Sequence, residues 1–174
     1  MTTKNKIKEM IMGLSKSPWI IHVNCNSCNG CDIEVLACLT PLYDAERFGI
    51  LNIGTPKQAD IMVVTGAVNY KNVNVLKNIY NQIPDPKVVL AVGACASTGG
   101  IFHGCYNVIG GVDQVIPVDV YVPGCTPRPE AIIDGIVACL PILEEKKKKN
   151  IKGQEVKLKG SEALSTDNLA STTA

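Results

Sequence analysis

Short apolar runs alternate with helical patterns along most of this chain. Four runs are bounded by glycine, proline or polar residues, as strands buried on both faces are, and they cover residues 19–23, 61–64, 87–92 and 118–122. Between the second and third runs, apolar residues repeat at helical spacing in Val73, Leu76 and Ile79. Strands that alternate with helices favour an α/β fold with a mainly parallel sheet.

Two further helices have ends that the sequence marks. Asp32 is suited to cap a helix that Pro41 would stop. A long final helix is expected over residues 127–143, where Pro141 should kink or end it. With the four strands, these helices predict a flavodoxin-like α/β fold, in which helices flank a mainly parallel sheet.

Three segments that contain cysteine and glycine follow predicted strands directly. They are residues 25–31, 93–100 and 123–125. The carboxyl ends of parallel strands meet at one edge of the sheet, so segments that are distant in sequence come together there. The sequence therefore predicts a site built from three loops at that edge.

The composition predicts one domain with ragged ends. At 174 residues and 46% hydrophobic content, the chain can bury one sizeable core. We expect a lead-in helix over residues 1–16, the α/β domain over 17–149 and a disordered tail over 150–174. The lysine run at 146–149 is interpreted as a solvated helix end. A net charge of +1 gives no argument for a nucleic-acid partner.

The eight cysteines favour metal ligation over disulfides. No apolar run reaches the roughly 18 residues that a membrane span needs, and the first residues lack the apolar core of a secretory signal. We therefore expect a cytoplasmic protein, soluble or peripheral on a membrane. Thiols normally stay reduced in that compartment, so some of these cysteines are expected to bind metal.

Four cysteines have the arrangement that a cubane iron–sulfur cluster requires. Such a cluster needs four thiolates, and a Cys-x-x-Cys pair on a tight loop supplies two of them. Cys28 and Cys31 form such a pair, and Cys95 and Cys125 lie singly on separate loops. Glycines beside these cysteines let the backbone turn and approach a bound group closely.

Spacing alone leaves two alternatives open. Cys25 and Cys28 form a second, overlapping Cys-x-x-Cys pair. Four cysteines can also hold zinc, although zinc ribbons usually bring two such pairs together. The cysteines outside the chosen set are interpreted as small buried apolar residues, and these are Cys25, Cys38, Cys105 and Cys139.

Five ordered segments carry a resemblance to a known family. They are residues 27–34 (SCNGCDIE), 42–49 (LYDAERFG), 84–87 (PDPK), 93–100 (GACASTGG) and 117–130 (PVDVYVPGCTPRPE). Together they resemble the small subunit of membrane-bound, energy-converting NiFe-hydrogenases, which is homologous to the 20 kDa iron–sulfur subunit of respiratory complex I. The resemblance runs from about Ser17 to Leu143. Thr126 stands where the family more often has proline, which leaves the neighbouring cysteine unaffected.

The resemblance implies a ligand set and a branch of the family. It implies one 4Fe-4S cluster bound by Cys28, Cys31, Cys95 and Cys125, which leaves Cys25 outside the ligands. Complex I subunits carry adjacent cysteines where this chain has Cys-Asn-Gly-Cys, the pattern of the hydrogenase members. By resemblance, Glu34 assists proton movement near the active site; the alternative is an ordinary first-turn glutamate stabilised by the helix dipole.

The resemblance also implies partners. The cluster would be the one proximal to a NiFe centre in a separate large subunit. Electrons would come from ferredoxin through a ferredoxin-like polyferredoxin subunit, and membrane-embedded subunits would translocate ions. The chain would then be peripheral on the inner face of the cell membrane. The rivals are a complex I-like oxidoreductase of quinone or another acceptor, a sulfur reductase, and a zinc-stabilised interaction module with no redox role.

Overall fold

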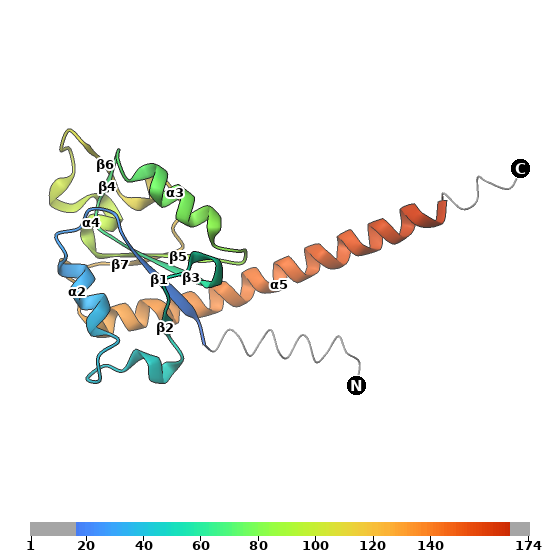
Figure 1. The fold of residues 1–174 in the computed structure, drawn as a ribbon, viewed down its shortest axis with the longest axis horizontal. Coiled ribbons are helices and arrows are strands. Elements are labelled where there is room, and N and C mark those ends of the chain that lie inside the picture. Colours follow the sequence, from blue (N-terminus) through green and yellow to red (C-terminus); the bar gives the residue numbers. More distant parts are fainter. Residues whose placement is uncertain (1–16, 168–174) are drawn as a thin grey trace, which may run out of the picture.

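A five-stranded parallel sheet forms the centre of the domain (Figure 1). The structure is a computed structural model that describes residues 17–167, with side chains described for residues 17–150, so the predicted lead-in helix lies outside the described residues. The strands are β1 (Trp19–Asn24), β2 (Leu51–Asn52), β3 (Ile61–Thr65), β5 (Val88–Val92) and β7 (Val120–Val122). Their order across the sheet is β2-β1-β3-β5-β7, the 2-1-3-4-5 order of flavodoxin-like folds. The predicted fold class is confirmed.

Helices cover both faces of this sheet (Figure 1). Helices α2 (Gly30–Ala37) and α5 (Pro129–Asp167) contribute to the core on one face, and α3 (Val73–Gln82) and α4 (Gly93–Thr98) to the core on the other. In β3, Ile61 and Val63 pack in the first core, whereas Met62 and Val64 pack in the second. Because successive side chains of a strand point to opposite faces, a strand covered on both sides is apolar throughout.

The strands end at one level, and this alignment positions the site. Asn24 at the end of β1 pairs with Thr65 of β3, which pairs with Val92 of β5, which pairs with Val122 of β7. Each of the three predicted cysteine segments begins just beyond one of these residues. The prediction that parallel strands bring them to one edge is confirmed.

Several short elements have no signal in the sequence. Strand β4 (Val68–Asn69) pairs with β6 (Val108–Gly110) in a separate antiparallel sheet. Short 3-10 helices occur at η1 (Ala45–Phe48), η2 (Pro56–Gln58), η3 (Gly100–Phe102) and η4 (Val112–Gln114). Elements of two to four residues are shorter than the windows in which apolar periodicity can be recognised.

Two helix boundaries differ from those expected. Helix α2 ends at Ala37 rather than running up to Pro41. Helix α5 continues through Pro141 to Asp167, so Pro141 does not end it, and its helical backbone enters the predicted tail. The boundary between domain and tail stays a prediction. None of the helices in the described part of the chain is both long and apolar enough to cross a membrane.

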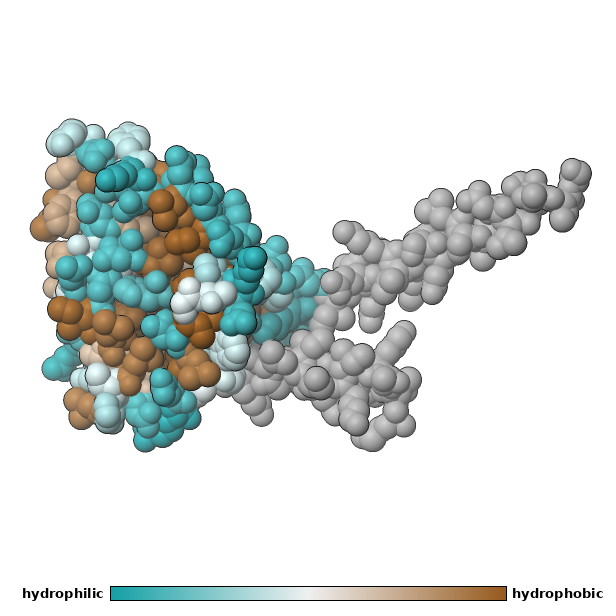
Figure 2. All heavy atoms as spheres, in the orientation of Figure 1, coloured by the Kyte–Doolittle hydropathy of each residue, from teal (hydrophilic) through white to brown (hydrophobic). Residues whose placement is uncertain are grey.

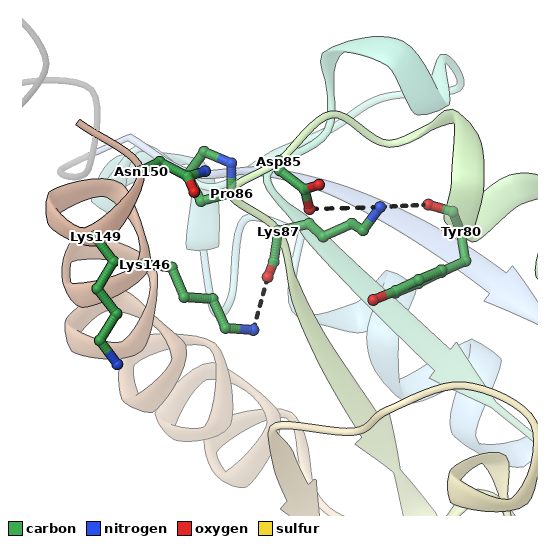
Figure 3. Close-up of a pocket in the computed structure, with 7 residues that line it drawn as sticks. All are labelled: Tyr80, Asp85, Pro86, Lys87, Lys146, Lys149 and Asn150. Carbon is green, nitrogen blue, oxygen red and sulfur yellow. Dashed lines mark hydrogen bonds and ion pairs between the residues drawn. The ribbon is translucent and has the colours of Figure 1, made fainter. Parts of the chain in front are cut away.

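The lysine run of α5 holds that helix against the amino-terminal edge of the sheet. The Lys146 ammonium donates to both carboxylate oxygens of Asp119, at 2.7 and 2.8 Å. It also donates to the backbone oxygen of Lys87 at 2.9 Å (Figure 3). Lys147 lies 3.4 Å from a carboxylate oxygen of Asp60. The interpretation of this run as a merely solvated helix end is therefore wrong for Lys146 and Lys147.

Candidate metal centre

The loop after β1 is built by its own polar side chains. The Asn24 side-chain oxygen accepts hydrogen bonds from the backbone N–H groups of Asn26, at 2.8 Å, and Ser27, at 2.9 Å. The Ser27 hydroxyl in turn accepts the N–H of Asn29 at 3.0 Å, and Asn29 adopts a left-handed conformation before α2 begins. These bonds replace the strand ladder and turn the chain, which leaves Cys28 exposed in the loop and Cys31 buried in the first turn of α2.

The other two cysteine segments are tied to each other. Cys95 lies in the short helix α4, directly after β5, rather than in the expected loop, and Cys125 lies in the loop after β7. The backbone N–H of Ala94 donates to the oxygen of Gly124 at 2.8 Å. This bond holds the two segments side by side, with Cys95 buried and Cys125 exposed.

The four cysteines act on one another electrostatically. Burial, followed by the charges of Cys95, Cys28, Asp32 and Cys125, raises the pKa of the Cys31 thiol to about 11. The pKa of Cys95 is also raised, by burial and then by Cys125 and Cys28, while a hydrogen bond from the backbone N–H of Ile101 opposes the rise. Like charges at close range disfavour ionisation, so free thiolates would repel here and a cation would relieve the repulsion.

Glycines make the space around these sulfurs. A Cβ atom on Gly93 would lie 2.5 Å from the Cys31 sulfur, and one on Gly100 would lie 3.0 Å from the Cys95 sulfur. A Cβ on Gly30 would lie 3.6 Å from the Cys28 sulfur and only 2.6 Å from a methyl group of Thr126. The loops therefore approach one another more closely than larger residues would permit.

The donor set fits an iron–sulfur cluster. Four cysteine thiols are the ligands that cubane clusters use, and soft thiolates favour iron–sulfur and zinc over hard cations. Within the described residues, no group of three or more His, Cys, Asp or Glu side chains has the geometry of a metal site, so the fit rests on the donor type and on the glycines. The four thiols supply the ligands of an iron–sulfur cluster, and the glycines against three of them leave space beside the sulfurs. The residues therefore fit such a cluster.

The remaining cysteines lie apart from this set. Cys25 is buried, and burial raises its pKa to about 12. Cys38 and Cys139 are also buried, with sulfurs 3.2 Å from the backbone oxygens of Glu34 and Gly135 respectively. These three are small buried residues, as predicted. Cys105 is exposed, so the buried interpretation is wrong for it, because the loop before β6 lies on the surface.

Asp32 does not cap α2, contrary to the expectation. The residue before the helix is Asn29, which makes no side-chain capping bond, and Asp32 is inside the first turn. Its carboxylate is buried and accepts a hydrogen bond from the Thr65 hydroxyl at 2.5 Å. Sequence reasoning missed this contact. The available signal was a threonine that ends the neighbouring buried strand.

Glu34 lies on the same helix as Cys31. The glutamate is half-buried, one turn beyond that cysteine. Its charge acts on Cys38, where it contributes to a raised pKa of about 11 after burial and against a backbone hydrogen bond. The structure thus places Glu34 on α2 near the site without assigning it a partner.

Two hollows lie away from the cysteines. One, of about 230 Å³, is at the amino-terminal edge of the sheet, where the ammonium groups of Lys87 and Lys146 already bind protein oxygens (Figure 3). The other, of about 490 Å³, runs beside β1 and includes His22 and Asn24. Neither contains any of the four site cysteines.

Comparisons with known proteins agree with this geometry. The family described as "NADH ubiquinone oxidoreductase, 20 Kd subunit" matches residues 28–139. The probable membrane-bound hydrogenase subunit mbhJ of Pyrococcus furiosus is 48% identical over 91% of this chain and 93% of its own length. Formate hydrogenlyase subunit 7 of Escherichia coli is 45% identical over 79% of this chain and 54% of its own length.

A solved structure extends the likeness to three dimensions. The membrane-bound sulfane sulfur reductase, an archaeal respiratory membrane complex, contains a chain that is 42% identical, with a TM-score of 0.68, over 79% of this chain and 76% of its own length. The segment that the family matches, residues 28–139, includes all four site cysteines. The chain therefore belongs to the family of the 20 kDa subunit of NADH ubiquinone oxidoreductase, and it is a subunit of an oxidoreductase complex.

Proposed function

We propose that this chain is the electron-transfer subunit of a ferredoxin-linked, membrane-bound NiFe-hydrogenase and that it holds one 4Fe-4S cluster. The observation that carries the proposal is the group of four cysteines at the carboxyl ends of three parallel strands. Cys28, Cys31, Cys95 and Cys125 would be the ligands. When bound, such a cluster accepts and releases single electrons.

The exposure of the ligands supports a relay between subunits. Cys31 and Cys95 are buried, whereas Cys28 and Cys125 are exposed. The site thus has one side in the domain and one at the surface, where a redox group of a partner can approach. The buried side excludes water, and backbone donors such as the Ile101 N–H stabilise sulfur charge.

The metal is tested on the purified chain. Anaerobic purification with iron and sulfide analysis should give about four irons per chain and a cubane EPR signal after reduction. Cys125→Ser should lose most of the iron, whereas Cys105→Ser, which changes another exposed cysteine, should keep it. About one zinc per chain with no cubane signal would favour the zinc-stabilised module and sink the proposal.

The hydrogenase branch is favoured by the pattern of the first ligand pair. Cys28 and Cys31 are separated by Asn-Gly, the hydrogenase pattern in the resemblance described above. The alternative is the equivalent subunit of a complex I-like oxidoreductase of quinone or another acceptor, or of a sulfur reductase, and the likeness to the sulfane sulfur reductase chain supports it. Nickel in the purified complex and hydrogen evolution from reduced ferredoxin would support the hydrogenase. Sulfur reduction without nickel would support the alternative.

Exposed apolar residues near the ligands mark the face for the large subunit. Ile33 on α2 is 64% exposed and Ile101, whose backbone contacts Cys95, is 82% exposed. Figure 2 shows apolar residues among polar ones at the end of the domain where α2 lies. We infer that the NiFe-hydrogenase large subunit docks here, because exposed apolar groups close to a redox site are best covered by the partner that uses it.

The docking face has a matched control on the opposite side of the sheet. Ile33→Glu should release the large subunit while the iron content stays constant. Val75→Glu changes an equally apolar residue, 53% exposed on α3, and should leave the complex intact. Equal co-purification of the large subunit with both variants would contradict the assignment of this face.

Other partners follow from the complex proposed. A ferredoxin-like polyferredoxin subunit would deliver electrons, and membrane-embedded ion-translocating subunits would hold the assembly on the membrane. The chain would then be peripheral, on the inner, cytoplasmic face. Extraction of the subunit from membrane vesicles by detergent, but not by salt alone, would support membrane attachment through the complex.

Glu34 is proposed to assist proton transfer in that complex. It is half-buried on the ligand-bearing helix α2, and its carboxylate can exchange a proton with a group of the large subunit. Glu34→Gln should lower hydrogen turnover while the cluster spectrum stays intact, and Glu46→Gln, an exposed control on η1, should not. Unchanged hydrogen turnover in Glu34→Gln would contradict the proton-transfer role and favour the alternative, a first-turn glutamate stabilised by the helix dipole.

A further inference from the structure

A buried carboxylate lies beside one of the proposed ligands. Asp32 follows Cys31 directly and is 8% exposed. One of its oxygens accepts the Thr65 hydroxyl at 2.5 Å and lies 2.8 Å from the His22 ring nitrogen Nε2. The other accepts the Asn24 amide at 3.1 Å and a hydrogen bond from the Ser27 hydroxyl.

These donors come from three different elements. His22 and Asn24 belong to β1, Thr65 ends β3, and Ser27 lies in the loop that carries Cys28. Such donors compensate a buried carboxylate for its lost hydration, and this many of them hold it in one place. The Asp32 side chain is therefore fixed by the loop and by two strand ends.

The carboxylate lies next to a proposed ligand. Cys31 and Asp32 are consecutive residues in the first turn of α2, and both are buried. A buried carboxylate there opposes any further negative charge placed at this site. A one-electron reduction adds a negative charge, so a nearby carboxylate makes reduction less favourable.

We propose that the Asp32 carboxylate lowers the reduction potential of the group bound by Cys31, and that the Thr65 hydroxyl limits this effect by compensating part of the charge. This inference rests on the proposed cluster. In this proposal Asp32 and Thr65 set the reduction potential, a role separate from folding the loop and from binding the cluster.

Two substitutions should move the potential in opposite directions. Asp32→Asn removes the charge, so the midpoint potential should rise. A tenfold change in the one-electron reduction equilibrium corresponds to a rise of about 59 mV. Thr65→Val removes the 2.5 Å donor and leaves the charge less compensated, so the potential should fall. Thr65→Ser keeps the hydroxyl and should retain the wild-type potential.

The assay is an EPR-monitored redox titration of the full chain at one pH, with iron content measured in parallel. Asp85→Asn removes the same charge from an exposed turn at the far edge of the sheet, and should not shift the potential. A purely structural role for Asp32 would lower cluster content without shifts of opposite sign.

The outcomes separate this inference from the function on which it rests. A wild-type chain that binds no cluster overturns both. A bound cluster with the same potential in Asp32→Asn and in wild type overturns only the inference. Should Asp32→Asn fail to hold a cluster, Thr65→Val decides: a lower potential supports the inference, and an equal or higher one overturns it.

Discussion

Gly93 is the position where a single methyl group should disturb the site most. Its φ is +88°, a conformation that costs other residues roughly 1–2 kcal/mol. A Cβ there would also lie 2.5 Å from the Cys31 sulfur, about 0.9 Å inside the 3.4 Å at which ordinary contacts begin. Overpacking of this kind typically costs about 1–3 kcal/mol. Gly93→Ala should therefore lower the free energy of unfolding by about 2–5 kcal/mol and displace a proposed ligand.

Two other glycines separate the contributions to that cost. Gly104 has φ +83° but no atom within 4 Å of an added Cβ, so Gly104→Ala tests the backbone alone and should cost about 1 kcal/mol. Gly54 has neither a positive φ nor a close neighbour, so Gly54→Ala should change stability by less than about 0.5 kcal/mol. The difference between Gly93→Ala and Gly104→Ala isolates the contact with sulfur.

The assay is urea unfolding of the cluster-free chain, with iron and sulfide content measured after anaerobic reconstitution. Gly93→Ala alone should lose iron, because its Cβ occupies the space beside Cys31. Full iron content together with a stability equal to that of Gly104→Ala would refute the close approach inferred at Gly93.

Three further changes test the packing of α5. Asp119→Asn removes the carboxylate that binds Lys146 at 2.7 and 2.8 Å. It should lower the free energy of unfolding in urea by only about 1–2 kcal/mol, because both side chains are partly exposed. An unchanged free energy of unfolding would show that this ion pair does not hold α5 in place. Burial raises the pKa of Cys139 from 9.0 to about 12. The thiol therefore loses its proton at lower pH in the unfolded chain than in the folded one, and stability should fall as the pH rises from about 9 to about 12. Cys139→Ala should reduce this loss between pH 8 and pH 10 by about 1 kcal/mol, and an unchanged slope would argue against the burial of that thiol. Pro141→Ala should raise helix content and stability by about 2 kcal/mol, since proline removes a helical hydrogen bond, and a loss of stability would show that Pro141 has a packing role.

Much of the fold follows from patterns that are local in the sequence. Strand β3 is predicted from its run of four apolar residues, and α3 is predicted because Val73, Leu76 and Ile79 recur at helical spacing. Local periodicity does not define ends. Helix α5 extends past its predicted end. Strand β7 is shorter than the predicted run 118–122, and beside its start the Asp119 carboxylate accepts the Val89 N–H at 2.9 Å.

The sequence by itself determined that three cysteine loops share one sheet edge, because parallel strands leave no other place for segments that follow them directly. Only the tertiary structure decided how each residue is used there. It packs Cys25 in the core on one face of the sheet and Cys31 in the core on the other, a difference that two identical spacings do not indicate. It also turned Asp32 from an expected helix cap into a buried carboxylate bound to Thr65, 33 residues away. Contacts of this kind depend on which strands become neighbours, and no local pattern records that.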